Sequence, residues 1–359
     1  METKNIEKIV KNNILREDLK FIFDNHTSKK EFYGKKILLI GNKGFLGKYL
    51  SNYFIYYFKK LKINKLIFLD IANKKNISKN IIYLKADVRK SMSFLSKYKP
   101  DIIMHAATIA SPIYYRQNPI GTALANVDGL KAILDYSKKN SNIRTLFFSS
   151  SEIYGNPDNK NIPTKEDYNG NVSCIGPRAC YDESKRFCET LAYVYSKKFK
   201  LNINVVRPFN NFGPGLSIYD GRLPADMANA AINKKTFKIF SNGKPTRTFC
   251  YVSDAIIGYL NTFKLKGFNV LNIGNPNNEV SILKFTKIFS KCAKEVLKIK
   301  TKIEFKRNYD EEYLIDSPQR RCPNINLAKK IIKFNPKINL NNGIKRYLEY
   351  LKYEKENNE

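Results

Sequence analysis

The sequence is poor in the residues on which several classes of enzyme depend. It contains two histidines, His26 and His105, and no tryptophan. Two imidazoles cannot build a multi-histidine metal site, so we predict no metal centre. A Ser-His-Asp triad would have to use one of these two histidines. We therefore expect acid/base chemistry from the 23 tyrosines instead.

Cysteines and long apolar runs are also scarce. The six cysteines of this 359-residue chain include no Cys-x-x-Cys pair, which argues against a zinc ribbon, a redox pair and a disulfide scaffold. No run reaches the roughly 18 apolar residues of a membrane span, and residues 1–18 lack the apolar core of a secretory signal. We expect a cytoplasmic protein with reduced thiols and no membrane contact.

Acidic residues are outnumbered two to one. The chain has 32 Asp+Glu against 64 Lys+Arg, a formal net charge of +32, yet only 13 of the basic residues are arginine. Proteins that read nucleic acid favour arginine, whose planar fork grips phosphates and guanines. We interpret the excess as a lysine-rich surface that attracts anions in general, and we expect no nucleic-acid partner.

The apolar runs predict an α/β fold with a doubly wound parallel sheet and a smaller C-terminal lobe. A polar, helical extension covers residues 1–34. Short apolar runs then alternate with amphipathic stretches, as in Rossmann folds. We predict a Rossmann domain over 35–209, with later strands returning to it near 245–275. Its predicted strands are residues 37–41, 66–70, 81–87, 101–107, 145–151 and 203–209.

The regular alternation breaks after residue 209. The segment 210–224 is punctuated by Gly and Pro, which favours loops. We predict that 210–244 and 276–350 form a smaller α/β lobe that binds substrate. The elements expected after residue 209 are helices near 224–234, 281–297 and 325–334, and strands at 237–240 and 269–273.

A glycine-rich turn follows the first predicted strand. It reads Gly41-Asn42-Lys43-Gly44-Phe45-Leu46-Gly47, and glycines at this spacing let the backbone approach a pyrophosphate at a helix N-terminus. Asp70 ends the second strand, where a carboxylate accepts ribose hydroxyls and repels a 2′-phosphate, although it could also cap a helix. The predicted cofactor is therefore NAD, bound by Gly41, Gly44, Phe45, Leu46, Gly47, Asp70, Asp87, Val88, Ala106 and Ala107.

A second motif predicts hydride transfer. Tyr181 and Lys185 lie four residues apart, on one helix face, so the ammonium can lower the phenol pKa and hold the nicotinamide ribose. Ser149-Ser150-Ser151 ends the preceding strand and supplies a hydroxyl for the same substrate oxygen. We expect Tyr181 as the base, a serine as its hydrogen-bond partner, and NAD as hydride acceptor.

From residue 35 to 350 the sequence resembles the extended short-chain dehydrogenases/reductases, and within them the NAD-dependent epimerase/dehydratase family. The UDP-glucuronate decarboxylases (UDP-xylose synthases) are the most similar group. The blocks that carry this resemblance are SSSEIYG (149–155), GPRACYDESKR (176–186), RPFNNFGPG (207–215), DGRLP (220–224), PTRTFCYVSDA (245–255), NIGNP (272–276) and SPQRRCP (317–323).

The resemblance implies a UDP-sugar acid as substrate, NAD regenerated in each turnover, and a homodimer. The related 4,6-dehydratases carry Asp-Glu where this chain has Ser151-Glu152, so an acid for dehydration is missing here. Arg247 matches the decarboxylase arginine that faces the carboxylate-bearing carbon. The implied catalytic residues are Tyr181, Lys185, Ser150, Ser151, Glu152 and Arg247, and the expected substrate-binding residues are Asn210, Arg222, Arg321, Tyr114 and Tyr115.

Three functions stay open at this point. The first is decarboxylation of UDP-glucuronate to UDP-xylose through a 4-keto intermediate. The second is another NAD-dependent nucleotide-sugar reaction, 4-epimerisation or 4,6-dehydration. The third is non-catalytic binding of a dinucleotide or nucleic acid, against which the complete Ser-Tyr-Lys set argues.

Overall fold

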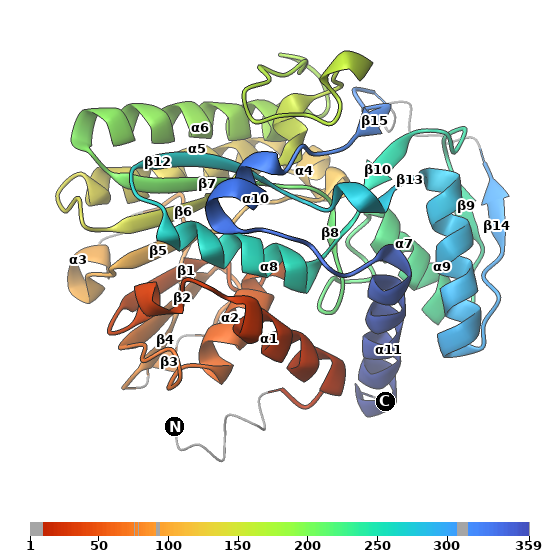
Figure 1. The fold of residues 1–359 in the computed structure, drawn as a ribbon, viewed down its shortest axis with the longest axis horizontal. Helices are drawn as coiled ribbons and strands as arrows, with labels where there is room; N and C mark the ends of the chain where they lie inside the picture. Colours follow the sequence, from red (N-terminus) through yellow and green to blue (C-terminus); the bar gives the residue numbers. More distant parts are fainter. Residues whose placement is uncertain (1–9, 75, 78, 91–93, 307–314, 359) are drawn as a thin grey trace.

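The computed structural model describes residues 10–74, 76, 77, 79–90, 94–306 and 315–358. Within these residues, eight strands form one sheet in the order β12-β7-β6-β5-β1-β2-β4-β3 (Figure 1). All neighbouring pairs are parallel except β3 with β4. The strands are β1 (Lys36–Ile40), β2 (Lys65–Asp70), β3 (Asn76–Ile77), β4 (Ile81–Lys85), β5 (Ile102–His105), β6 (Arg144–Phe148), β7 (Asn202–Pro208) and β12 (Phe268–Ile273).

Helices cover both faces of this sheet, because alternate residues of each buried strand point to opposite sides. In β1, Leu39 belongs to the apolar cluster that contains α2 (Phe45–Tyr56) and α8 (Val252–Asn261). Leu38 belongs to a cluster that includes Ile133 of α5 (Pro119–Ser137). α6 (Ala179–Phe199) packs beside α5. The predicted doubly wound α/β fold is confirmed.

The N-terminal extension is part of the core. Its helix α1 (Asn13–Asn25) packs on α8 and on α11 (Leu340–Asn358) (Figure 1). The buried Asp18 carboxylate accepts hydrogen bonds from the hydroxyls of Tyr49 and Tyr251, at 2.5 and 2.6 Å. It also forms an ion pair with Arg346 at 2.8 Å. The extension therefore joins α2, the start of α8 and the C-terminal helix.

Elements after β7 lie against one end of the sheet. α7 (Leu223–Ile232), β9 (Phe237–Ile239), α9 (Ile282–Leu297) and β14 (Ile303–Phe305) are grouped at the right of Figure 1. β10 (Thr246–Thr248) pairs with β13 (Glu279–Ser281) and β15 (Arg320–Arg321). The remaining elements include α3 (Phe94–Tyr98), α4 (Pro112–Gln117), the short helix η4 (Ser151–Tyr154), β8 (Asn211–Phe212), β11 (Cys250–Tyr251) and α10 (Asn326–Ile332).

Several predicted elements agree with these bounds, but the region 245–275 differs from prediction. β12 does return to the main sheet beside β7, whereas β10 and β11 belong to separate small sheets. The prediction also missed α8, which lies between them. All ten residues of α8 are buried, the polar Ser253, Asp254 and Asn261 included, and the helix is shorter than the roughly 11–18 residues over which helical periodicity is read.

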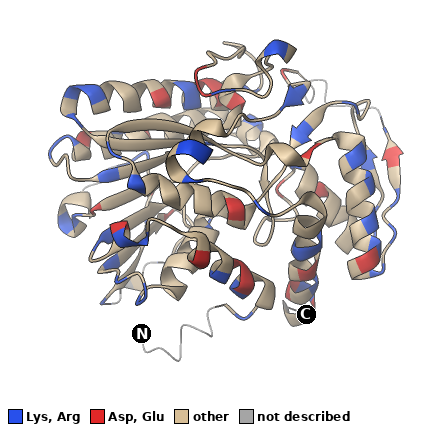
Figure 2. Cartoon of the chain, viewed as in Figure 1, with Lys and Arg blue, Asp and Glu red and all other residues tan. Residues whose placement is uncertain are grey.

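The described part of the chain carries many basic side chains but neither a membrane-spanning helix nor a metal-binding cluster. Lysine and arginine occur on most helices in the view of Figure 2. No helix in the described part is long and apolar enough to cross a membrane. No group of three or more His, Cys, Asp or Glu side chains there could hold a metal ion. All six cysteines are described, and none is in a disulfide.

Candidate active site

A cavity of about 810 Å³ opens where the glycine turn, the end of β6 and the start of α6 meet the C-terminal elements. Open α/β sheets bind ligands at this place, outside the carboxyl ends of the strands. Its lining includes Gly44, Gly47, Ser150, Ser151, Glu152, Arg178, Tyr181, Asn210, Arg222, Arg247 and Arg321. Residues predicted from distant parts of the sequence are thus brought to one space.

The glycine turn joins β1 to α2, and two of its glycines have no room for a side chain. A Cβ on Gly47 would lie 1.9 Å from the Gly41 carbonyl oxygen. Gly41 itself has φ +88°, and a Cβ there would lie 2.6 Å from the Ala107 nitrogen. Gly44 is the N-cap of α2 and has no side-chain cap. The turn therefore leaves backbone N–H groups at a helix N-terminus free for a phosphate.

The other predicted cofactor residues are placed unevenly. The Asp70 carboxylate, at the end of β2, accepts hydrogen bonds from the backbone N–H of Lys43 and of Ala72, both at 3.0 Å. It thus holds the glycine turn directly. Asp87 is paired with Arg89, whose hydrogen bond lowers the Asp87 pKa.

The Val88 side chain is buried and packs in the core near Gly129, and its contact with the cofactor stays a prediction. Of the two alanines after β5, Ala106 lines the cavity and Ala107 packs against Gly41. Phe45 and Leu46 line the cavity as well.

Tyr181 and Ser150 form the predicted pair. Burial raises the pKa of the Tyr181 phenol to about 12, and a hydrogen bond with the Ser150 hydroxyl works against that rise. Ser151 also lines the cavity, whereas Ser149 donates to Glu189 on α6. Of the three serines, Ser150 is therefore the partner of the phenol.

Lys185 is bonded to the backbone in the structure, and its predicted lowering of the Tyr181 phenol pKa stays a prediction. The Lys185 ammonium donates to the Phe148 carbonyl at 2.6 Å and lies 5.8 Å from the Tyr181 ring centroid. It is 1% exposed, and this burial lowers the pKa of Lys185 itself to about 8. The phenol of the chain alone is therefore neutral at physiological pH.

The two adjacent tyrosines of α4 are in different surroundings. Tyr115 is buried and stacks on Tyr181, with centroids 5.2 Å apart and planes 9° from parallel. Its hydroxyl has no hydrogen-bond partner among the described residues. Tyr114 is 44% exposed, lines the cavity, and donates to the Tyr219 carbonyl at 2.8 Å. Tyr115 thus fixes the ring of the predicted base.

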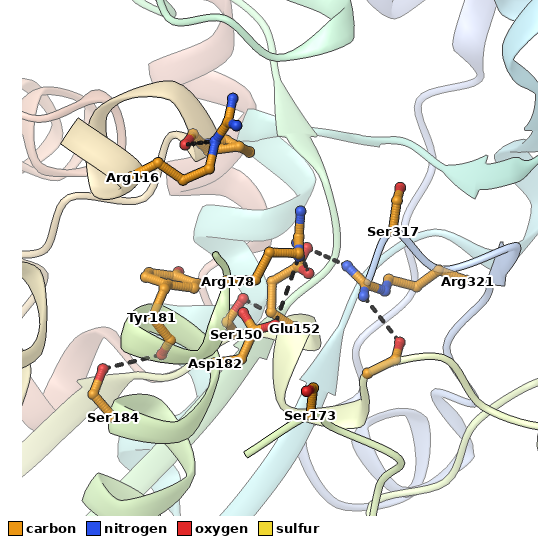
Figure 3. Close-up of polar contacts among 12 residues, drawn as sticks. Arg116, Ser150, Glu152, Ser173, Arg178, Tyr181, Asp182, Ser184, Ser317 and Arg321 are labelled. Atoms are coloured by element: carbon orange, nitrogen blue, oxygen red, sulfur yellow. Dashed lines mark hydrogen bonds and ion pairs between the residues drawn. The ribbon is translucent and has the colours of Figure 1, made fainter. Parts of the chain in front are cut away.

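Glu152 is clamped by two arginines. Its carboxylate forms ion pairs with Arg178, at the start of α6, and with Arg321 on β15 (Figure 3). Burial raises the pKa of Glu152, but the two guanidinium groups outweigh it and the net pKa is well below the usual range. Glu152 is therefore an ionised group that organises arginines, and it has no proton to donate.

Arg321, a predicted substrate-binding residue, lines the cavity. It is 2% exposed and is bonded to Glu152 and to the Gly155 carbonyl. It therefore belongs to the Glu152 cluster. Arg222 is paired with Asp220 and lines the cavity.

Arg247 and Asn210 line the cavity too. Arg247 donates to the Thr246 carbonyl at 2.8 Å and to the Ser317 hydroxyl at 3.3 Å. Its charge is among the groups that lower the Glu152 pKa. Asn210 donates to the Thr248 carbonyl at 3.0 Å.

Comparison with known families decides the identity of the fold. The sequence profile described as "NAD dependent epimerase/dehydratase family" matches residues 37–274. This chain belongs to that family. Its cofactor is NAD, as the glycine turn and the Tyr181–Lys185 helix are built to accept. Gly41, Gly44 and Gly47 would hold the pyrophosphate, and Lys185 and Tyr181 would lie toward the nicotinamide end.

Among curated relatives of this family member are three UDP-glucuronic acid decarboxylases. Decarboxylase 6 of Arabidopsis thaliana is 33% identical over 86% of this chain and 86% of its own length. Decarboxylase 1 of the same plant is 33% identical over 87% and 68%. The Danio rerio enzyme is 32% identical over 90% and 74%.

Solved structures of other proteins share this fold. The UDP-glucose 4-epimerase of Thermotoga maritima, solved with UDP-glucose, has a TM-score of 0.76 and 20% identity, over 89% of this chain and 99% of that one. MoeE5, solved with UDP-glucuronic acid and NAD, has a TM-score of 0.73 and 18% identity, over 89% and 99%. These similarities establish the fold of this family member.

Sequence reasoning missed two residues of the site. Arg178 and Asp182 flank Tyr181 in the same short block, yet neither received a role. The signal was present: the block GPRACYDESKR places a cation and an acid within one helical turn of the base. Arg178 lies with its Nε 3.7 Å from an Asp182 oxygen.

Proposed function

We propose that this protein is an NAD-dependent UDP-glucuronate decarboxylase that forms UDP-xylose. The observation that carries the proposal is the set of arginines at the cavity. Arg178, Arg321 and Arg247 face or adjoin it, and one carboxylate, Glu152, offsets them. Such an excess of positive charge suits a sugar that bears a carboxylate. The similarity to decarboxylases in the previous section supports the same choice.

The chemistry needs a base at the C4 hydroxyl. Tyr181, oriented by the Ser150 hydroxyl and by stacking on Tyr115, is the proposed base. Bound NAD supplies an acceptor and later a donor of hydride at C4. Because the positive nicotinamide ring favours the phenolate, Tyr181 takes the proton more readily in the loaded enzyme than its pKa in the chain alone implies.

The oxidised sugar is a β-keto acid. Its C5–carboxylate bond breaks to release carbon dioxide, and the bonding electrons move into the C4 ketone to form an enolate. Arg247 is proposed to bind the substrate carboxylate and then to position the enolate, whose C5 carbon takes a proton from water. Glu152, held ionised by Arg178 and Arg321, keeps the arginines in position rather than acting as an acid. Tyr181 returns its proton to the C4 oxygen when the ketone is reduced.

We also propose that the protein is a homodimer. α5 and α6 pack side by side and expose large apolar side chains: Ile120, Leu124, Phe187, Tyr193 and Val194. A second copy would cover this apolar face. Light scattering should give twice the 41.6 kDa mass of the chain, and Phe187→Asp should shift the protein toward the monomer. A monomeric wild type would refute the dimer.

Mass analysis of the product tests the proposed reaction. Purified protein incubated with UDP-glucuronate and NAD should release carbon dioxide and yield UDP-xylose. Tyr181→Phe should reduce turnover by at least about 100-fold, the scale of general-base catalysis. Tyr195→Phe is the matched control, since Tyr195 is on the same helix and bonds Asp135 outside the cavity. Turnover of another nucleotide sugar without carbon dioxide would instead indicate 4-epimerisation or 4,6-dehydration.

A further inference from the structure

Asp182 is a buried acid beside the base that none of the steps above uses. It is 4% exposed, and its Oδ1 atom has no hydrogen-bond partner among the described residues. Its other oxygen lies 3.7 Å from Nε of Arg178, beyond hydrogen-bond distance. Arg178 forms a shorter ion pair with Glu152 than with Asp182, and Glu152 is also paired with Arg321 (Figure 3). Asp182 is thus the poorly compensated acid of the pair.

Charged and titratable groups reach Asp182 from several elements. Arg178 and Tyr181 come from its own helix, Glu152 from η4, and Arg321 from β15. Asp316 precedes β15, and the Tyr115 phenol comes from α4. Burial, followed by repulsion from Glu152, raises the pKa of Asp182 well above its ordinary value. A buried carboxyl with an unpartnered oxygen, beside a second carboxylate, therefore keeps its proton at pH values where an exposed aspartate has lost it.

The protonation of Asp182 changes the charge of the cluster. With Asp182 neutral, Arg178 and Arg321 exceed Glu152 by one positive charge. With Asp182 ionised, that excess is cancelled. Arg178, Arg321 and Glu152 line the cavity, whereas Asp182 is absent from the lining. Asp182 can therefore influence a ligand only through the arginines.

We propose that Asp182 is a positioning residue that controls how strongly the Arg178–Glu152–Arg321 cluster attracts a carboxylate-bearing sugar nucleotide. As the neutral acid it leaves one positive charge for the substrate carboxylate, and as the carboxylate it withdraws that charge. The inference rests on the proposed function, because only a sugar acid would sense the difference. The preference for an acidic over a neutral sugar nucleotide therefore declines at alkaline pH.

Equilibrium binding to the NAD-loaded Tyr181→Phe protein tests this inference, because that variant should bind without turnover. Calorimetric Kd values for UDP-glucuronate and UDP-glucose are compared between about pH 7 and pH 9. We expect the ratio of the Kd for UDP-glucuronate to the Kd for UDP-glucose to rise as the pH increases, by about tenfold once the pH is one unit above the pKa of Asp182. The neutral sugar corrects for ionisation of Lys185, which acts on both ligands.

Two further variants in the same background assign the effect. Asp182→Asn has nearly the same shape and cannot ionise, so its ratio should stay constant with pH. Glu183→Gln removes an exposed carboxylate from the next position, where Glu183 pairs with Arg186 at 3.4 Å, and its ratio should rise as in the parent.

A ratio that is independent of pH in the parent, or one that still rises in Asp182→Asn, would overturn the inference. If Asp182→Asn does not fold, the pH dependence of the Kd values for UDP-glucuronate and UDP-glucose in the Tyr181→Phe protein still tests the inference. Failure of UDP-glucuronate to bind at pH 7 is a different outcome, since it rejects the proposed function and the inference with it.

Discussion

Replacing Gly47 by alanine should damage the fold as well as cofactor binding. The new Cβ would lie 1.9 Å from the Gly41 carbonyl oxygen, so the turn must open by about 1.5 Å to reach ordinary contact. Overpacking of this kind costs about 1–3 kcal/mol. We therefore expect Gly47→Ala to lose about that much unfolding free energy in urea, and its NAD affinity to fall about tenfold or more.

Gly44→Ala is the matched control within the same turn. Its Cβ would lie 3.4 Å from the same oxygen, and its backbone φ is −69°, which alanine adopts freely. Its unfolding free energy should stay within about 0.5 kcal/mol of wild type, although NAD affinity should still fall because Gly44 lines the cavity. Equal stability of Gly47→Ala and wild type would refute the reasoning, as would equal losses in both variants.

Three other changes have expected outcomes. Asp18→Ala should cost about 2–4 kcal/mol of unfolding free energy in chemical denaturation, because it leaves the buried hydroxyls of Tyr49 and Tyr251 without their acceptor and leaves Arg346 only Glu17 as an ion-pair partner. Glu17→Ala, which removes the exposed partner of Arg346, should cost less than about 1 kcal/mol, and equal costs would contradict the account. Lys185→Met should raise the melting temperature at pH 7, since burial lowers the Lys185 pKa to about 8. That cost of the ammonium is full below pH 8 and vanishes as the pH approaches 10.5, so a gain that persists at pH 10.5 would have another cause. Arg247→Ala should lower turnover of UDP-glucuronate about tenfold or more with unchanged NAD affinity; parallel losses would place Arg247 at the cofactor.

The sheet was predictable because its signals are local. Each buried strand is a short apolar run, and the glycine turn follows the first of them directly. α8 escaped because its ten residues are fewer than the roughly 11–18 over which helical periodicity is read. No strand was predicted at β10 or β11, which have three and two residues and are too short to show the alternation of a strand.

Most residues of the site could be predicted from the sequence, but the contacts among them could not. Spacing correctly put Tyr181 and Lys185 on one helix, but the direction of the ammonium depends on the Phe148 carbonyl, which comes from another strand. Glu152 was identified from its block. Its ion pairs with Arg178 and Arg321 were not predicted, because these arginines are 26 and 169 residues away in the sequence.

The contact between α1 and α11 bears on how the chain is made. Asp18 and Arg346 are 328 residues apart, so α1 cannot complete this contact until the residues up to Arg346 have been synthesised. Until then the buried Asp18 carboxylate lacks its guanidinium partner. Synthesis of α11 is therefore the event that completes the contacts of α1.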